Sequence, residues 1–463
     1  VHMAGEKEIE DACKAAVSAQ SEWIEMGLEA RCEIFERCAD LLAGPWRMKS
    51  NASTMLNQSK TAFQAEIDAA CELIDFWRFN CHYARGFHDQ LQPLVSPDGV
   101  VNSTEIRPLE GFVLAITPFN FSSIAANLPS APAIVGCTSV WKPSRNSYHS
   151  NYVLMRLMME AGLPPGVINF VPSSGPKISR MALSNPDFAG LHFTGSTSTF
   201  QGLWKRIGES LDGLRSYPRI VGETGGKEFI VAHPECDEQG LIVALLRGAF
   251  EYQGQKCSAA SRAYIPESVW ARISEPLAKE ISKIKMGDAS DFTNFMTAVI
   301  DQRAFDKITG YIDRARERET CDVFVGGESD DSTGWFIEPT IIVTQDSRSE
   351  TMVEEIFGPV LTAIPFDFEE DAVKIANSVR YGLAGYLWTQ DVGRAHRVAQ
   401  SLDAGMIWVN SENNRHLPAP FGGMKASGIG RDGGDYSFEF YMEQKNICVA
   451  LGTHNVPSLG KSG

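Results

Sequence analysis

The sequence has no long apolar run. Hydrophobic residues make up 43% of its 463 positions, yet even the apolar stretch from Ala131 to Cys137 is interrupted by Pro132 and Gly136. A helix that crosses a membrane needs about 20 consecutive apolar residues. We therefore expect a soluble protein with no membrane partner. The helical pattern begins directly after Gly5, so we also expect no signal peptide.

Basic clusters are lacking as well. The formal net charge is −16 and the isoelectric point is about 5.1, and no block rich in Lys and Arg interrupts this acidic balance. An acidic surface repels the phosphate backbone of DNA or RNA. We therefore expect no nucleic-acid partner.

Paired metal-ligand motifs and phosphate-binding motifs are also missing. The ten cysteines include no Cys-x-x-Cys pair and no His-rich neighbour at zinc-finger spacing, which argues against a structural metal. Scattered cysteines in a long chain are typical of a reducing compartment. No Gly-x-Gly-x-x-Gly or P-loop motif stands where a dinucleotide or nucleotide site would need it.

The spacing of apolar residues changes along the chain. From Glu6 to about Arg85 it is helical, and it predicts one continuous helix over residues 62–79. From Gly111 short apolar strands alternate with helices, and a second series of the same kind starts at Lys227. Alternating strands and helices form parallel, twisted sheets. We therefore expect an α/β fold with two sheets of similar size.

Cys257 differs in its position from an ordinary core cysteine. It lies in the segment from Gln253 to Ala259, after an apolar helix and before a strand, where a side chain can face a cleft. Its Gly, Gln and Lys neighbours are not typical of a core. A buried structural cysteine is nevertheless the default for a single cysteine. Position alone leaves both interpretations open.

Three further local patterns suit a ligand site. Glu223 lies in a glycine-rich turn before a strand, and Asn120 follows an apolar strand at the edge where open α/β sheets bind ligands. Gly195-Ser196 separates a strand from a helix, a place that suits a dinucleotide phosphate. Each pattern has an ordinary alternative: an exposed loop acid for Glu223, a helix cap for Asn120 and a plain turn for Gly195-Ser196.

Together these patterns resemble the aldehyde dehydrogenase family over essentially the whole chain. Seven motifs occur in the family's order, and Glu223 precedes Cys257 by the family's spacing of 34 positions. The motifs are Pro118 to Phe121, Trp141 to Ser144, Phe193 to Ser196, Glu223 to Lys227, Gly254 to Cys257, Glu354 to Val360 and Pro420 to Gly423.

The resemblance implies an enzyme that oxidises an aldehyde to an acid through a thioester on Cys257. In the family, the matching cysteine attacks the aldehyde, and the amide matching Asn120 holds the oxyanion together with the cysteine N–H. The residue matching Glu223 activates the water that hydrolyses the thioester. Relatives that pass the acyl group to coenzyme A lack this glutamate, so the resemblance implies release of a free acid.

The resemblance also implies a bound dinucleotide. Glu355 would contact the nicotinamide ribose, Phe357 the nicotinamide, Lys142 the adenosine ribose and Ser196 the pyrophosphate. The implied cofactor-binding residues are Thr117, Pro118, Phe119, Lys142, Ser144, Gly195, Ser196, Gly225, Glu355 and Phe357.

Arg145 bears on the choice between NAD and NADP. The family often has an acid three residues after the lysine that matches Lys142, where it binds the ribose hydroxyls and repels a 2′-phosphate. This chain has Arg145 there, and a cation tolerates or favours NADP. We expect NAD, which the most similar subfamily mostly uses, with NADP as the alternative.

Residues 30–365 most resemble the subfamily of pyrroline-5-carboxylate (glutamate semialdehyde) dehydrogenases of proline catabolism. In that subfamily the serine after the nucleophile, here Ser258, helps to bind the substrate carboxylate. The resemblance therefore implies oxidation of L-glutamate 5-semialdehyde to L-glutamate. The matching segments are Gln64 to Ala70, Leu109 to Val113, Phe119 to Phe121, Phe250 to Ala259 and Thr297 to Asp301.

From about Gly405 the chain resembles 2-hydroxymuconic-type semialdehyde dehydrogenases instead. It has Asn413 and Asn414 where the first subfamily holds the α-carboxylate with small residues. Arg415 is a candidate partner for a remote carboxylate, or a plain surface arginine. The alternatives are therefore another carboxylated semialdehyde as substrate, or a non-catalytic structural member of the fold. The implied substrate-binding residues are Phe121, Ser258, Asn413, Asn414, Arg415 and Phe421.

The family's architecture implies three parts of the chain. Residues 1–225 would form a Rossmann-like NAD(P)-binding domain, residues 226–425 the α/β catalytic domain, and residues 426–463 a return to the cofactor domain. Residues 91–112 and the C-terminal strand would build a small β element through which members associate, so we expect a homodimer or a higher homo-oligomer. The subfamily is cytoplasmic in bacteria and mitochondrial in eukaryotes. We expect the cytoplasm, with the mitochondrial matrix as the alternative.

Overall fold

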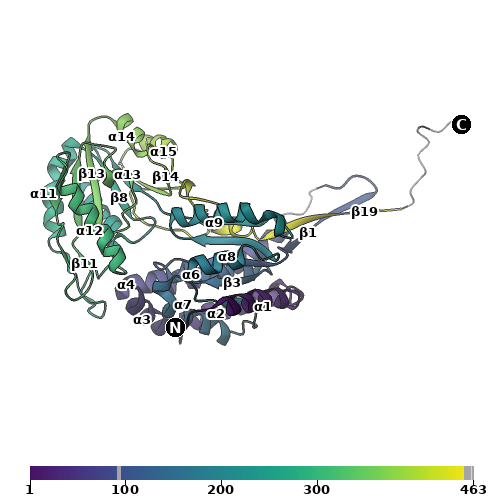
Figure 1. The fold of residues 1–463 in the computed structure, drawn as a ribbon. Helices are drawn as coiled ribbons and strands as arrows, with labels where there is room; N and C mark the ends of the chain where they lie inside the picture. The colour runs from purple at the N-terminus through teal and green to yellow at the C-terminus, as the bar shows by residue number, and fades with distance from the viewer. Residues whose placement is uncertain (91–94, 453–459, 461–463) are drawn as a thin grey trace.

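The computed structural model describes residues 1–90, 95–452 and 460. It has a helical N-terminal region, a six-stranded sheet, a seven-stranded sheet and a long two-stranded arm (Figure 1). The predicted α/β class and the two sheets of similar size are confirmed.

Six helical segments open the chain, and they follow the predicted helical region except at one turn. Residues 62–79 do not form the single α-helix that the spacing predicts, because a π-helical turn, η1, separates α4 from α5. A π turn is wider than an α turn and shifts the face on which later residues lie. The segments are α1 (Glu6–Glu25), α2 (Leu28–Ala43), α3 (Arg47–Gln58), α4 (Ala62–Ala65), η1 (Glu66–Cys71) and α5 (Glu72–Gln90).

The six-stranded sheet has the order β18-β6-β5-β2-β3-β4 and is parallel except for β18. Its strands are β2 (Phe112–Ile116), β3 (Thr138–Lys142), β4 (Ile168–Phe170), β5 (Phe188–Thr194), β6 (Arg219–Glu223) and β18 (Gly428–Ile429). The helices between them are α6 (Ser122–Ile134), α7 (Tyr148–Glu160), α8 (Gly175–Ala182) and α9 (Thr197–Ser210).

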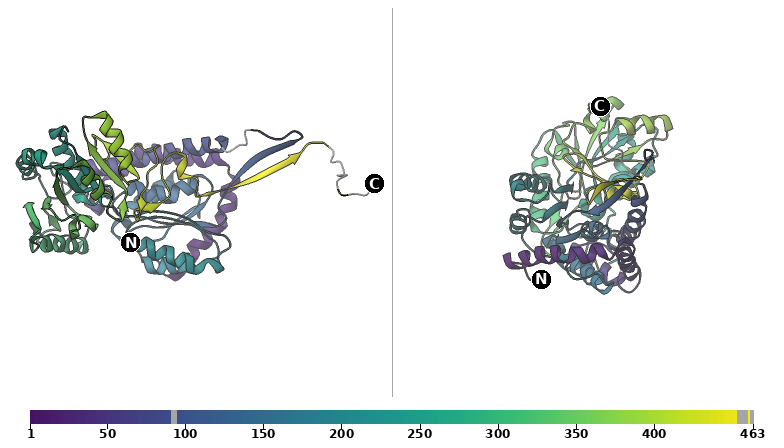
Figure 2. Two further views of the ribbon diagram at one scale, coloured as in Figure 1. Left: turned by 90° about the horizontal axis from the view of Figure 1, so that it is seen from above. Right: turned by 90° about the vertical axis from the view of Figure 1, so that its right-hand side faces the viewer.

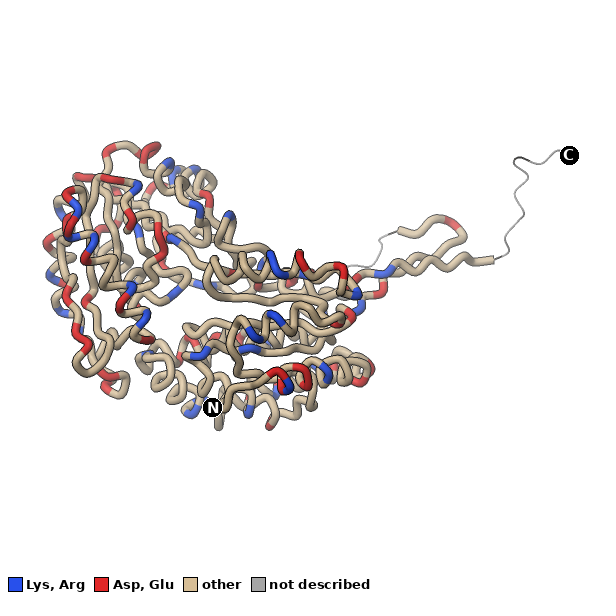
Figure 3. The backbone as a smooth tube through the Cα atoms, in the orientation of Figure 1, with Lys and Arg blue, Asp and Glu red and all other residues tan. Residues whose placement is uncertain are grey.

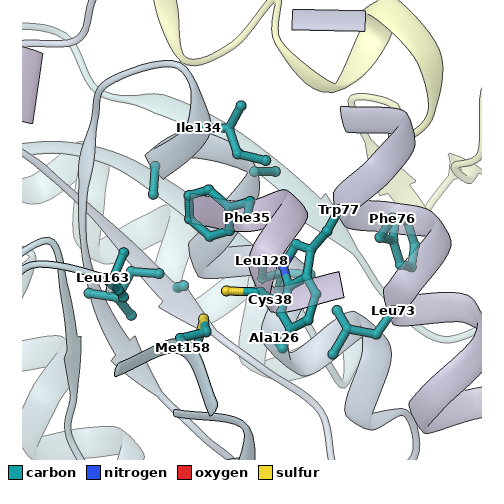
Figure 4. Close-up of a cluster of buried hydrophobic side chains, with 14 of the residues drawn as sticks. Phe35, Cys38, Leu73, Phe76, Trp77, Ala126, Leu128, Ile134, Met158 and Leu163 are labelled. Atoms are coloured by element: carbon teal, nitrogen blue, oxygen red, sulfur yellow. The ribbon is translucent and has the colours of Figure 1, made fainter. Parts of the chain in front are cut away.

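Helices cover both faces of this sheet because successive strand residues point to opposite sides. Phe112 and Leu114 of β2 belong to a core with α1, α8 and α9, whereas Val113 and Ala115 belong to a core with α2, α5, α6 and α7. Figure 4 shows part of the second core, including Trp77 of α5. Such two-sided burial explains why β2 reads as an uninterrupted apolar run.

The seven-stranded sheet has the order β16-β15-β7-β8-β13-β12-β9, with only β9 antiparallel to its neighbour. Its strands are β7 (Glu228–Ala232), β8 (Ala260–Pro266), β9 (Cys321–Val325), β12 (Thr340–Thr344), β13 (Val360–Phe366), β15 (Ala384–Trp388) and β16 (Met406–Val409). The flanking helices are α10 (Glu238–Phe250), α11 (Glu267–Ile281), α12 (Gln302–Arg316), α14 (Glu369–Ala376) and α15 (Val392–Ser401).

Short elements connect the larger ones. They are η2 (Arg145–Ser147), η3 (Leu211–Gly213), η4 (Glu251–Gly254), β10 (Ser329–Asp330), β11 (Phe336–Ile337), α13 (Glu350–Val353), β14 (Tyr381–Gly382), β17 (Met424–Lys425) and η5 (Gly434–Ser437).

The arm consists of β1 (Val100–Pro108) paired antiparallel with β19 (Met442–Ala450). It projects away from the body of the molecule (Figures 1 and 2). Residues 91–94 of the predicted oligomerisation element, and residues 453–459 and 461–463 of the predicted C-terminal part, lie outside the described residues.

Acidic and basic side chains are interspersed along the chain (Figure 3). Over the described ranges, no helix is long and apolar enough to span a membrane.

Candidate active site

Two cavities meet at Cys257. The larger one, of about 550 Å³, extends between the C-terminal ends of the six-stranded sheet and the segment that contains Glu355. The smaller one, of about 130 Å³, lies between η1, the start of α6 and the loop that contains Arg415. We call them the cofactor cleft and the acyl pocket. Cys257 and Ile124 line both, so a group attached to the sulfur can face either space.

A strained turn places Cys257 there. After α10 ends, Tyr252 and Gln253 of η4 both adopt left-handed backbone conformations, with φ of 52° and 55°. Such conformations cost on the order of 1–3 kcal/mol each and persist only where the surroundings enforce them. Here the Tyr252 hydroxyl donates to the Gln58 carbonyl at 2.9 Å, and the Gln253 amide donates to the Ala298 carbonyl at 2.8 Å. These bonds hold Cys257 on a connection between a helix and a strand, as the sequence predicts.

The surroundings keep the Cys257 thiol protonated. Burial raises its pKa well above the usual range, and Glu223 and Glu228 raise the pKa further, while Arg415 acts in the opposite direction. The thiolate is the nucleophilic form of cysteine. The thiol must therefore lose its proton before or as the sulfur attacks.

Glu223 is a buried carboxyl group whose charge acts on the same sulfur. It is the last residue of β6, at the edge of the sheet, and so it precedes the glycine-rich turn in which the sequence places it. Burial, reinforced by Asp432, raises its pKa to about 8. Its Oε1 atom is buried and has no hydrogen-bond partner among the described residues. A carboxyl group with such a pKa can both accept and release a proton near neutral pH.

Asn120 lines the cofactor cleft together with Cys257. It is buried in the short loop between β2 and α6, and its amide donates to the Gln255 carbonyl at 3.0 Å. Phe121, not Asn120, is the N-cap residue of α6, so the helix-cap alternative for Asn120 is wrong. The second amide hydrogen of Asn120 is available for an oxyanion.

All ten residues that the sequence assigns to the cofactor line the cofactor cleft. Ser196 is the N-cap of α9, and its hydroxyl accepts from the Thr199 N–H at 3.3 Å. A helix N-terminus in a cleft suits a phosphate group. Lys142 lies deep enough for burial to lower its pKa to about 8. Arg145, in contrast, is exposed and does not contribute to the lining.

Glu355 and Phe357 reach the cleft by unusual local geometry. The Gly226 N–H donates to Glu355 Oε1 at 3.0 Å, and a Cβ atom on Gly225 would lie 2.2 Å from the Glu355 carboxylate, so a larger residue there would displace that carboxylate. Phe357 has a left-handed φ of 60°, and its ring meets that of Phe119 edge to face at 6.0 Å. A carboxylate and an aromatic edge in one cleft fit a ribose and a nicotinamide ring.

The acyl pocket contains most of the predicted substrate-binding residues. Phe121, Ser258, Asn413, Arg415 and Phe421 line it. Asn413 has a left-handed φ of 46°, and its side chain accepts from the Tyr386 hydroxyl at 3.0 Å. Asn414 does not line the pocket. It is exposed, and its carbonyl accepts from the Trp408 indole at 3.0 Å.

Arg415 is not a surface arginine. Its Nη1 lies 3.0 Å from Glu72 Oε1, and its guanidinium stacks over the Phe421 ring at 3.9 Å. Burial raises the pKa of Glu72, while Arg415 opposes that rise. Arg415 Nε is buried without a hydrogen-bond partner among the residues described, which leaves it free for a ligand oxygen.

Sequence reasoning missed several residues of the two cavities. In the acyl pocket they are mostly charged: Asp68, Glu72, Arg247, Glu251, Lys256, Trp408 and Glu412. In the cofactor cleft they include Asn146, Asp301, Arg303 and Lys307. Within the described part of the chain, no group of three or more His, Cys, Asp or Glu residues is arranged to hold a metal ion.

Comparison with known proteins agrees with this geometry. Residues 1–447 match the sequence model of the aldehyde dehydrogenase family. The chain is 45% identical to delta-1-pyrroline-5-carboxylate dehydrogenase of Agaricus bisporus, over 97% of its own length and 84% of that protein. It is 43% identical to the mitochondrial delta-1-pyrroline-5-carboxylate dehydrogenase of Homo sapiens, over 90% and 75% of the two chains. The structure also superposes on that of the NAD-bound delta-pyrroline-5-carboxylate dehydrogenase of Mycobacterium tuberculosis, with a TM-score of 0.92 and 43% sequence identity. The match covers 98% of this chain and 85% of the other chain. This chain belongs to the aldehyde dehydrogenase family, as the resemblance of its motifs implies.

Proposed function

We propose that this protein oxidises L-glutamate 5-semialdehyde, the open form of 1-pyrroline-5-carboxylate, to L-glutamate with NAD. The observation that carries the proposal is that Cys257 lines both the cofactor cleft and the acyl pocket. The relatives named for this reaction are 43–45% identical over most of the chain. The reaction consumes the aldehyde, one water and NAD, and it yields the acid, NADH and a proton.

The catalytic roles are assigned from the positions of three side chains. The Cys257 thiol releases its proton to solvent and its sulfur attacks the aldehyde carbon. The carbonyl oxygen becomes an oxyanion held by the Asn120 amide and the Cys257 N–H, each worth about 3 kcal/mol. When bound in the cleft, the nicotinamide accepts the hydride and leaves a thioester on Cys257. Glu223 then takes a proton from water, which attacks the thioester and releases the acid.

The cofactor is NAD, and the cleft fits it. The N-terminus of α9 would meet the pyrophosphate, Glu355 a ribose and Phe357 the nicotinamide. Arg145 is exposed outside the lining residues, so its charge gives little support to NADP as the alternative. Initial rates with low concentrations of each dinucleotide decide between them.

The acyl pocket supports an amino-acid aldehyde in particular. The substrate carries a carboxylate and an ammonium group on the same carbon, and Arg415 and Glu72 present the two opposite charges 3.0 Å apart. Binding would exchange the internal ion pair for two pairs with the substrate. Ser258 and Asn413, which line the same pocket, would add hydrogen bonds to the carboxylate.

The second candidate is a carboxylated semialdehyde without an amino group, such as a 2-hydroxymuconic-type compound. The observation in its favour is that Glu72 is already neutralised by Arg415, so that the pocket offers Arg415 Nε to a carboxylate alone. NADH formation from pyrroline-5-carboxylate and from an aromatic-ring-cleavage semialdehyde, measured side by side, tests both candidates. Turnover of neither would support a non-catalytic, structural member of the fold.

We propose the three-part division of the chain that the family's architecture implies. The change from the six-stranded to the seven-stranded sheet between β6 and β7 supports the boundary near residue 225. The return of β18 to the first sheet supports a cofactor-domain segment after residue 425.

The projecting arm of β1 and β19 supports a homodimer or higher homo-oligomer, which light scattering can measure. Cell fractionation tests the cytoplasm against the mitochondrial matrix; the relative from Homo sapiens is named mitochondrial.

A further inference from the structure

Lys60 is a buried lysine near the active site that has no part in the proposed mechanism. Its ammonium group is enclosed by a cage of Phe121, Tyr252 and Asp68. Its side chain is 0% exposed, in the loop between α3 and α4. The ammonium lies 4.5 Å from the centre of the Phe121 ring and 4.3 Å from that of Tyr252. Asp68 Oδ2 is 2.5 Å from the same nitrogen. One cation therefore contacts two aromatic faces and a carboxylate.

These three partners belong to three different segments, and two of them, Phe121 and Asp68, line the acyl pocket. Phe121 follows Asn120 directly and begins α6. Tyr252 is one of the two left-handed residues of η4, five positions before Cys257. Asp68 lies in η1 and lines the pocket itself. The cage therefore joins the segment of the predicted oxyanion donor to the segment of the predicted nucleophile.

The backbone beside Lys60 reinforces the same connection. The Gln58 carbonyl accepts from the Tyr252 hydroxyl at 2.9 Å, and the Ser59 carbonyl accepts from the Gln253 amide at 3.2 Å. The two strained residues before Cys257 are thus both held by the Lys60 loop. On the opposite side, Asn120 donates to the Gln255 carbonyl.

Burying a charged ammonium group in this space costs free energy of desolvation. Burial lowers the pKa of Lys60 to about 8, and the positive Lys256 lowers it further, while Asp68 and Glu72 act in the opposite direction. An apolar side chain of similar volume often gives equal or greater stability than a buried ion pair. Contact of a desolvated cation with an aromatic face is attractive, and its strength depends on the direction of approach. This charge therefore favours a role in fixing geometry over a role in stability.

We propose that Lys60 is a positioning residue that fixes the Asn120 amide relative to the Cys257 sulfur. The inference rests on the proposed function, because it takes Cys257 as the nucleophile and Asn120 as the oxyanion donor. Lys60 lines neither the acyl pocket nor the cofactor cleft. It acts through the rings of Phe121 and Tyr252, and a shift of 1 Å between reacting groups can cost about 100-fold in rate.

The test compares Lys60→Met with the unaltered protein in rapid mixing. With NAD saturating and pyrroline-5-carboxylate as the aldehyde source, the first turnover of NADH reports attack and oxidation before hydrolysis. We expect this burst to slow by about 10- to 100-fold. The KM for NAD, and the rate at which iodoacetamide alkylates Cys257, stay within about twofold, because the cleft and the folded loop persist.

Two further variants distinguish a positioning role of Lys60 from a general effect of removing a lysine. Lys60→Met alone leaves Asp68 buried without its nearest cation, so Lys60→Met with Asp68→Asn removes the pair together and should fold with the same slow burst. The matched control is Lys49→Met, which removes an exposed ammonium 4.2 Å from the Trp46 ring, away from the site. It should leave all three measurements unchanged.

The outcomes separate this inference from the proposed function. A burst within about twofold of the parent in both Lys60 variants would overturn the positioning role. A slow burst with an equal loss of NAD affinity and thiol alkylation would overturn it too, because that pattern marks general disruption. A parent protein that forms no NADH with any carboxylated semialdehyde overturns the proposed function, and this inference with it.

Discussion

Arg415 Nη1 lies 3.0 Å from Glu72 Oε1 on the wall of the acyl pocket. The side chains are 17% and 13% exposed, and the Ser123 hydroxyl donates to the second carboxylate oxygen of Glu72. A pair this well enclosed is weak evidence for stability, since desolvation offsets most of its attraction. Its position beside Cys257 favours a part in selecting the substrate.

Glu72→Gln should separate the two substrate candidates. If Glu72 binds the ammonium group, loss of its charge removes about 1.5–3 kcal/mol, and the KM for glutamate semialdehyde rises by about 10- to 100-fold. Glutarate semialdehyde has the same carboxylate but no amino group, so its KM should stay level or fall, because Arg415 is freed. Steady-state NADH assays with both aldehydes measure the difference. Equal changes for the two substrates would rule out recognition of the amino group by Glu72.

The three proposed catalytic residues could be assigned from the sequence because each lies in a short motif that resembles the family's, and the structure places each motif next to the end of a secondary-structure element. Glu223 ends β6, Asn120 follows β2, and Cys257 stands between η4 and β8. The local sequence fixes such positions, and alternation of apolar strands and helices fixes the layer in which they lie. For the same reason the predicted cofactor-binding residues all line one cleft.

Glu72 and Lys60 could not be found in that way. Glu72 is one of several acids in a helical pattern, and its face depends on the π turn of η1 directly before it. Its partner Arg415 is 343 positions away. The burial of Lys60 likewise depends on Tyr252, which is distant in sequence and has a left-handed conformation that residue propensities do not predict. Contacts between distant segments decide both cases.

Lys142 should make cofactor binding dependent on pH. Burial lowers its pKa to about 8, so the ammonium loses its proton at a lower pH than an exposed lysine. If the charged form binds the adenosine ribose, the KM for NAD should rise as the pH passes through about 8. Lys142→Met should raise that KM by about 10-fold at pH 7 and leave it independent of pH. Lys205→Met, an exposed lysine of α9, is the control. A parent whose KM is flat from pH 7 to 9 would contradict the role.

Glu223→Gln should separate attack from hydrolysis. Glutamine cannot take a proton from water, so the thioester should accumulate and steady turnover should fall by about 100- to 10,000-fold. A burst of NADH that approaches one equivalent per active site should remain. In the parent, turnover limited by hydrolysis should rise as the pH passes through about 8, where half of the Glu223 carboxyl groups are ionised, and level off above that pH. Rapid-mixing and steady-state assays together measure both stages, and an unchanged steady state would remove Glu223 from the role of base.

The same substitution should change how stability depends on pH. The folded pKa of Glu223 is about 8, above its model-peptide value of 4.5, so folding favours the protonated group. Its contribution is fully present below pH 4.5 and is lost progressively as the pH rises to about 8, at about 1.4 kcal/mol per pH unit. Glutamine has no such dependence. Between pH 5 and about 8 the free energy of unfolding of the parent should therefore fall relative to that of Glu223→Gln.

The control is Glu209→Gln, which replaces an exposed acid of α9. Its free energy of unfolding should change with pH in the same way as that of the parent. Urea titrations across this range measure the gap. Parallel curves for Glu223→Gln and its parent would mean that the carboxylate ionises as readily in the folded protein as in the unfolded chain, and would thereby weaken the case for Glu223 as a base tuned to neutral pH.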